Sequence, residues 1–156
     1  MVGARENMGA RALLLDRLVD SNPQTTWEAV PLRILSVEEL KASIAKQLSD
    51  LLSTRRSLTK HDERVARTTL AYGIGDYSGT SLLDDENKPR ISDDIRKAIL
   101  KFEPRLSNVL VNIEAPDQNN ILAPTLVVIG AEYKIGSVRK SFNFEFPVAK
   151  LTQDEK

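Results

Sequence analysis

The sequence contains no cysteine, which excludes both a disulfide framework and a thiolate metal site. Its 22 basic and 22 acidic residues balance, so a general electrostatic attraction to nucleic acid or to an acidic membrane is not expected. No stretch approaches the roughly 18 consecutive apolar residues of a membrane span, and residues 1–9 lack the apolar core of a signal peptide. We therefore expect neither nucleic-acid binding nor membrane insertion.

The chain has enough apolar residues for one folded domain. Hydrophobic residues make up 41% of its 156 residues, and a chain of this length buries about 70% of its unfolded surface. We predict a flexible tail over residues 1–9, a helix and an extended connector over 10–35, the folded domain over 36–150, and a polar tail over 151–156. The only tryptophan, Trp27, lies in the connector and is expected either to fill the domain's own core or to anchor a partner.

Apolar residues at helical spacing predict two helices in the first third of the chain. The first, over residues 10–19, is short and leucine-rich. The second begins at Ser36, which forms a capping-box pattern with Glu39, and runs to about residue 53. Arg55 follows its end, where the helix dipole favours positive charge, and could in addition bind carboxylates of a partner.

A third helix is predicted from Ser92, interpreted as the N-cap, to Phe102. The paired carboxylates of Asp93 and Asp94 would then lie in its first turn. Paired carboxylates are also typical of general acid–base catalysis, but the helix dipole is a sufficient reason for acids at this place.

The segment between the second and third helices carries no recognisable catalytic or cofactor motif. Its three glycines lack the Lys-Ser/Thr pair of a phosphate-binding loop, and the lone His61 has no accompanying Ser or Cys motif. We expect Tyr72 and Tyr77 to fix this glycine-rich loop to the core. The sequence therefore predicts no cofactor, no metal and no catalytic residue.

Three alternating patterns after residue 105 predict strands over 106–115, 125–135 and 138–146. A two-residue turn at Gly136 joins the last two strands in a hairpin. Helices followed by antiparallel strands indicate an α+β fold, with N-terminal amphipathic helices packed on a C-terminal, mainly antiparallel sheet. The last strand, with Phe142 and Phe144 on its apolar face, is a candidate sheet edge that could accept a strand from another chain.

Glu103, Pro104 and Arg105 lie where the helical pattern stops and the first strand begins. Proline cannot continue a helix and restricts the residue before it, so an acid and a base flank a rigid bend. One interpretation is a local junction with solvated charges. The other is a docking device that presents Glu103 and Arg105 to a second subunit.

The order of these motifs resembles the TssE family, the small baseplate subunits of type VI secretion systems. The motifs are Leu13-Leu14-Leu15-Asp16-Arg17-Leu18, Leu51-Leu52-Ser53-Thr54-Arg55, Tyr72-Gly73-Ile74 with Asp76, and Phe102-Glu103-Pro104-Arg105-Leu106. That family is similar to the lysozyme-like wedge protein of contractile-tailed phage baseplates. The resemblance covers about residues 13–146.

The resemblance implies a structural, non-enzymatic subunit in the bacterial cytoplasm, within a membrane-docked baseplate. The implied partners are TssF, TssG and TssK-type baseplate proteins, the hub and spike, and the sheath subunits TssB and TssC. Glu103 and Arg105, held at a fixed angle by Pro104, would dock to the TssF–TssG core bundle. The sheet edge would start sheath polymerisation.

Two alternatives stay open at this stage. A lysozyme-like peptidoglycan glycosidase would need two carboxyl groups across a cleft, one of them protonated. Arg105 beside Glu103 favours the charged carboxylate, which does not suit a general acid. The other alternative is an unrelated α+β domain that binds a protein through Trp27 and the first helix.

Overall fold

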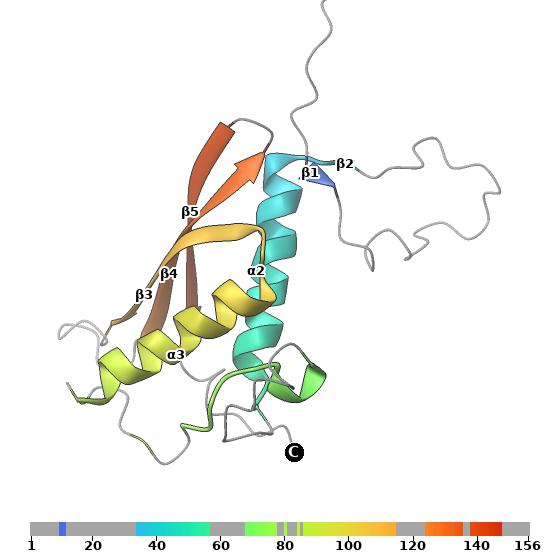
Figure 1. Ribbon diagram of the computed structural model, residues 1–156. Helices are drawn as coiled ribbons and strands as arrows, with labels where there is room; N and C mark the ends of the chain where they lie inside the picture. Colours follow the sequence, from blue (N-terminus) through green and yellow to red (C-terminus); the bar gives the residue numbers. More distant parts are fainter. Residues whose placement is uncertain are drawn as a thin grey trace, which may run out of the picture.

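The structure is a computed structural model that describes residues 10–11, 34–56, 68–77, 80, 84, 86–114, 124–135 and 138–147. Its helices α2 and α3 lie on one side of a three-stranded antiparallel sheet of order β3-β4-β5 (Figure 1). The predicted α+β class is confirmed. The elements are β1 (Ala10–Arg11), β2 (Ile34–Leu35), α2 (Val37–Ser53), the 3₁₀ helix η2 (Thr69–Ala71), α3 (Asn87–Phe102), β3 (Leu106–Glu114), β4 (Leu126–Ile135) and β5 (Val138–Pro147).

Helix α2 begins at the capping box that the sequence predicts. The Ser36 hydroxyl accepts a hydrogen bond from the Glu39 amide (3.2 Å), and the Ser36 amide donates to Glu39 Oε2 (2.8 Å). One side of the helix is buried, and burial of each leucine or isoleucine there contributes about 1.5–3 kcal/mol. The buried residues are Leu40, Ile44, Leu48, Leu51 and Leu52.

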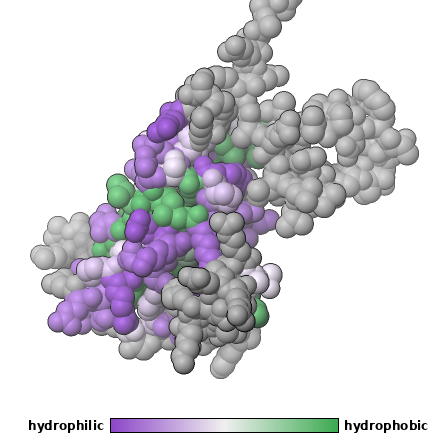
Figure 2. Space-filling view, viewed as in Figure 1, coloured by the Kyte–Doolittle hydropathy of each residue, from purple (hydrophilic) through white to green (hydrophobic). Residues whose placement is uncertain are grey.

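Helix α3 begins at Asn87, so the prediction of an N-cap at Ser92 is wrong. The Asp84 carbonyl accepts from the amides of Asn87 and Lys88 (both 3.0 Å), and its carboxylate accepts from the Asn87 side chain (3.2 Å). Pro89 then falls in the first turn, where a missing amide hydrogen costs no helical bond. The buried side of α3 carries Ile91, Ile95, Ala98 and Ile99, and Figure 2 shows its exposed side as hydrophilic.

The three predicted strands are present within one or two residues of their expected ends. Both strand pairs are antiparallel, with Ile113 opposite Val127 and Val127 opposite Phe146. The side of the sheet that faces the helices is apolar and forms the core with them. Its buried residues are Leu106, Val109, Ile113, Val127, Ile129, Ala131, Tyr133, Phe144 and Phe146.

Strand β3 contains an irregularity that the alternating pattern does not predict. The register with β4 shifts between Ser107 and Leu110, and Asn108 has a positive φ of 50°. This is the geometry of a β-bulge, in which one strand holds an extra residue. Asparagine tolerates such a left-handed conformation better than most residues. Edge strand β3 is therefore kinked, whereas β5 pairs with β4 in unbroken register.

The predicted first helix is wrong at its first two residues. Ala10 and Arg11 form strand β1, which pairs with β2 through Ala10 opposite Leu35. Trp27, His61, the turn at Gly136 and both predicted tails lie outside the described residues. Within the described part of the chain, no helix combines the length and apolarity that crossing a membrane requires.

Candidate functional site

The corner between α3 and β3 is a tight turn over residues 103–106. The Glu103 amide closes the helix on the Ile99 carbonyl (2.8 Å), and the Leu106 amide returns to the Glu103 carbonyl (3.1 Å). Pro104 occupies the second position of this turn, where its fixed φ is favoured. Glu103, which precedes the proline, has left the helical region at φ −120° and ψ 78°. The sequence predicts this corner correctly.

The two charges of the corner bind each other. Arg105 Nε donates to Glu103 Oε1 and Nη2 to Oε2, both at 2.6 Å, which is the forked geometry of a strong arginine–carboxylate pair. Arg105 Nη1 also donates to the Ser43 hydroxyl on α2 (3.3 Å). Glu103 is 3% exposed, whereas the Arg105 side chain is 20% exposed. The pair thus joins the corner to α2, and the half-buried Arg105 is its more accessible member.

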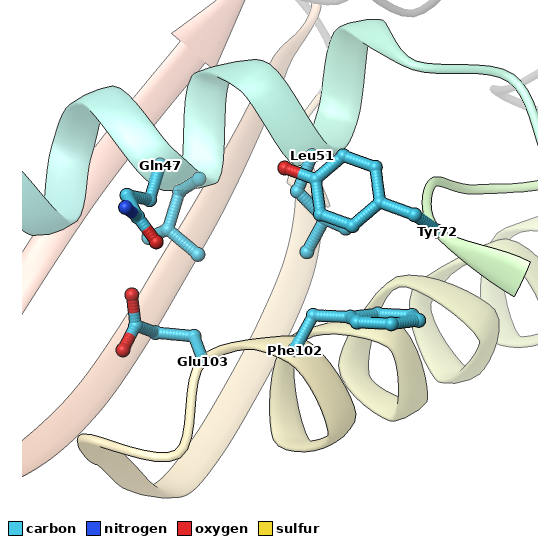
Figure 3. Close-up of a pocket in the computed structure, with 6 residues that line it drawn as sticks. Gln47, Leu51, Tyr72, Phe102 and Glu103 are labelled. Carbon is cyan, nitrogen blue, oxygen red and sulfur yellow. The ribbon is translucent and has the colours of Figure 1, made fainter. Parts of the chain in front are cut away.

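A small pocket lies beside Glu103 between the two helices (Figure 3). Gln47 and Leu51 line it from α2, Phe102 and Glu103 line it from the end of α3, and Tyr72 reaches in from the loop after η2. The rings of Tyr72 and Phe102 meet edge to face, with centroids 5.2 Å apart. Burial, together with the charges of Asp50 and Glu103, raises the Tyr72 pKa. The cavity volume of about 10 Å³ holds one water molecule and is far too small for a sugar ring.

A second polar cluster fixes the glycine-rich loop to α3. Asp94 accepts hydrogen bonds from the Tyr77 hydroxyl (2.7 Å), the Gly75 amide (3.0 Å) and Arg56 Nη2 (3.1 Å). The interpretation of Asp94 as a first-turn helix acid is therefore wrong. The expectation that Tyr72 and Tyr77 hold this loop to the core is confirmed, since Tyr77 is 7% exposed and belongs to the core cluster.

Asp94 links stability to pH. Burial acts to raise its pKa, but the hydrogen bonds from Tyr77, Gly75 and Arg56 outweigh it, so its pKa lies below the ordinary 3.8. A carboxyl group with a lowered pKa stabilises the fold above its unfolded pKa and loses that contribution as pH falls through the folded value.

We expect the free energy of unfolding to fall as pH drops from about 5 to below 4, and to fall less in Asp94→Asn. The variant should also lose about 1–3 kcal/mol at pH 7, because asparagine replaces a charged acceptor of three hydrogen bonds. Urea unfolding at a series of pH values measures both effects. Asp93→Asn is the comparison variant. Hydrogen bonds from Lys97 and Arg96 also lower the Asp93 pKa, but its side chain is 42% exposed and its partners are on its own helix, so we expect a smaller change in the pH profile. Parallel pH profiles for wild type and Asp94→Asn would contradict the expectation.

The other predicted partner-binding residues lie in varied surroundings. Arg55 Nη1 donates to the Leu52 carbonyl at the end of α2 (3.3 Å), in keeping with the helix-end role, while its Nη2 is buried without a hydrogen-bond partner. Phe142 stacks on Tyr133 with centroids 4.2 Å apart, and Phe144 is buried in the core. Both phenylalanines face the helices, so contact with a partner through β5 would use the main chain. Partner binding at all these positions stays a prediction.

Strand β5 is one edge of the sheet, and within the described residues no strand lies on its outer side. The Glu132 carbonyl accepts a hydrogen bond from the Ser107 hydroxyl of β3 (3.3 Å), so this carbonyl points toward β3. Main-chain groups alternate in direction along a strand, so those of Gly130 also point toward β3. Asn143 lies opposite Gly130 on β5. Its amide and carbonyl groups therefore point away from β4, toward the open edge of the sheet.

No group of three or more His, Cys, Asp or Glu residues in the described part of the chain is arranged to hold a metal ion. The features above are a braced helix–strand corner, a polar cluster that holds a loop, and an open sheet edge. Residues 38–133 match the family model for Baseplate wedge protein gp25, which is more than half of the chain. The chain therefore belongs to the baseplate wedge protein gp25 family. The predicted family is confirmed, and the alternative of an unrelated α+β domain is wrong.

Two solved structures are similar to this chain. One belongs to the baseplate complex from the type VI secretion system; it is 15% identical, covers 70% of this chain and 94% of its own, and has a TM-score of 0.49. The other, from Geobacter sulfurreducens, is described as a tail lysozyme; it is 24% identical, covers 74% of this chain and 95% of its own, and has a TM-score of 0.44. No curated protein sequence matches the chain.

Proposed function

We propose that this protein is a structural wedge subunit of a type VI secretion baseplate in the bacterial cytoplasm. In this role it docks to the TssF–TssG core bundle through the Glu103–Arg105 corner and starts polymerisation of the TssB–TssC sheath through the edge of β5. Membership in the baseplate wedge protein gp25 family carries the proposal. TssK-type proteins and the hub and spike are the remaining expected neighbours.

The open edge of β5 supports the sheath-initiating role. An edge strand offers unpaired amides and carbonyls to an incoming strand, and alternating side chains set the register. β5 pairs with β4 without interruption from Val138 to Pro147, so its outer side presents a regular series of such groups. The bulge in β3 makes the opposite edge irregular and less suited to strand addition.

Asn143→Pro is expected to block sheath initiation while the subunit still folds and joins the wedge. Its amide points away from β4, so proline removes one outward donor without breaking a hydrogen bond of the sheet. Counting assembled sheaths in cells that express the variant, together with co-purification of TssF and TssG, measures both effects. Asn143→Ala keeps the amide and is the matched control. Normal sheath numbers with Asn143→Pro would contradict pairing at this edge.

The exposed part of Arg105 supports docking at the corner. Nη1 and Nη2 each donate one hydrogen bond within the chain, to Ser43 and Glu103, and each carries a further hydrogen for a partner's carbonyl or carboxylate. Charge-assisted hydrogen bonds of this kind contribute about 1.5–3 kcal/mol each. Glu103 would act indirectly, because its carboxylate is buried and holds Arg105 in position.

The geometry of the corner speaks against the glycosidase alternative. Glu103 is engaged by Arg105 on both oxygens, and the adjoining cavity has room for water only. A glycosidase needs a protonated acid beside a cleft that admits sugar. A muramidase assay on the purified protein, with no release of peptidoglycan fragments expected, tests this part of the proposal.

A further inference from the structure

The sheet has a second face, turned away from the helices, which we call the outer face. It comprises alternate residues of each strand, with a step of three at the β3 bulge. The strand register aligns these residues in four rows across three strands, and a fifth row, Lys134-Arg139, spans β4 and β5 alone. The four rows are Ser107-Glu132-Ser141, Leu110-Gly130-Asn143, Asn112-Val128-Glu145 and Glu114-Leu126-Pro147. α2 and α3 both cover the opposite face (Figure 1).

An apolar strip crosses the outer face diagonally. Leu110 on β3 is 74% exposed, more than any other large hydrophobic residue in the described part of the chain. Val128 and Leu126 continue the strip on β4, and both are half-buried. In an antiparallel sheet with one face on the core and the other in water, the residues on the water-facing side are normally polar. Apolar side chains on this face therefore indicate a surface that makes contacts.

Gly130 lies at the centre of the outer face, next to Leu110 and Asn143. Its φ is not positive, and a Cβ built there would meet only Asn143 Oδ1, at an ordinary contact distance of 3.5 Å. The fold itself thus has room for a side chain. Glycine weakens a central strand relative to β-branched residues, and in strands it often marks the close approach of another backbone.

Charged residues of both signs lie on the outer face, with the basic pair Lys134-Arg139 at its hairpin end, whereas the charged residues of the four rows named above are all acidic. Glu114, Glu132 and Glu145 lie on it, and none makes an ion pair in the described part of the chain. Two of them only accept amide hydrogen bonds, Glu132 from Asn108 and Glu114 from Asn112. A partner that covers the apolar strip would need basic side chains at its margins to compensate these carboxylates.

We propose that the outer face binds a basic amphipathic α-helix of another protein chain, with its closest approach at Gly130. Three strands spaced about 4.8 Å apart form a surface about as wide as one helix, whose diameter is about 10–12 Å. Aliphatic side chains of that helix would contact Leu110, Val128 and Leu126, and lysine or arginine at its margins would face the glutamates. This site does not include the corner. It shares strand β5 with the proposed sheath edge but uses side chains of the face, whereas the edge would use main-chain groups, and it does not depend on the proposed function.

The test uses an 18-residue peptide of leucine and lysine at helical spacing, titrated into the ¹⁵N-labelled full-length protein. We expect amide shifts to centre on Leu110, Val128, Gly130 and Asn143. Gly130→Val should weaken binding at least 10-fold, because its side chain occupies the point of closest approach. The same variant should raise the melting temperature by about 2–4 °C, since valine is the better strand former. A loss of binding in it therefore cannot come from unfolding.

Two controls complete the experiment. Leu100→Ala removes another exposed leucine, on α3, and should bind the peptide as wild type does. A peptide with glutamate in place of lysine should bind at least 10-fold more weakly. Equal binding of the two peptides, unchanged binding by Gly130→Val, or shifts centred elsewhere would overturn the proposal. Concentration-dependent dimerisation in analytical ultracentrifugation that Gly130→Val abolishes would overturn it as well, because the occupant would then be a second copy.

Discussion

Arg105→Ala is expected to lower the free energy of unfolding by about 3–5 kcal/mol, because it leaves the buried Glu103 carboxylate without its partner. The side chain of Glu103 is only 4% exposed, so water cannot replace the two hydrogen bonds at 2.6 Å that Arg105 supplies. The variant also loses the bond to Ser43 that ties the corner to α2. Urea denaturation at pH 7 measures the change.

A double variant separates stability from docking. Glu103→Met combined with Arg105→Met removes both charges and keeps comparable side-chain volume, and such replacements of buried ion pairs are often neutral or stabilising. We expect it to recover most of the stability lost in Arg105→Ala while failing to co-purify with TssF and TssG. A loss below 1 kcal/mol in Arg105→Ala would show that the pair is not an internal brace. Normal co-purification of the stable double variant would count against docking at the corner.

Gly73→Ala is expected to destabilise the fold by about 3 kcal/mol or more. Gly73 has a φ of +102°, which side-chain-bearing residues rarely adopt, and a Cβ there would lie 2.3 Å from the Thr54 carbonyl oxygen. Because the nearest atoms belong to the main chain of Thr54 and Arg56, the backbone there or at residue 73 must move to relieve this contact. Ile74 and Thr54 are also joined by a hydrogen bond of 3.0 Å, so the movement would disturb the attachment of the loop to the end of α2.

Gly130→Ala is the matched control for this prediction. The added Cβ at Gly130 meets nothing closer than 3.5 Å, and the backbone conformation there suits any residue. We expect its stability to stay within about 1 kcal/mol of wild type, on the stabilising side. Thermal unfolding of the two variants gives the comparison. Similar melting temperatures for Gly73→Ala and wild type would show that the Thr54–Gly73 approach is relieved at no cost.

Local signals predict much of this fold from the sequence. The capping box at Ser36, the stop at Pro104 and the alternation of the strands each act over a few residues, and each corresponds to an observed element. The start of α3 is mispredicted for the same reason. Ser92 followed by acids is a good N-cap pattern, but Asp84 and Pro89 already begin the helix five residues earlier.

The site depends on contacts that no local pattern contains. Asp94 is bound by Arg56 and Tyr77, which lie 38 and 17 residues away in the chain. The proximity of Glu103 and Arg105 could be predicted, because only Pro104 separates them, at a rigid bend. The burial of Glu103 could not, since it comes from the packing of α2 over the corner, where Arg105 reaches Ser43 at a separation of 62 residues. The bulge at Asn108 likewise arises only when β3 pairs with β4.

The inequality of the two sheet margins has a consequence for assembly. The bulge at Asn108 makes the β3 margin irregular, while the β5 margin pairs with β4 in unbroken register from Val138 to Pro147. If the protein starts the sheath as proposed, strand addition is expected at the β5 margin alone. A ring of such molecules would then offer the same edge strand at every position, so the first sheath subunits would all add in one orientation.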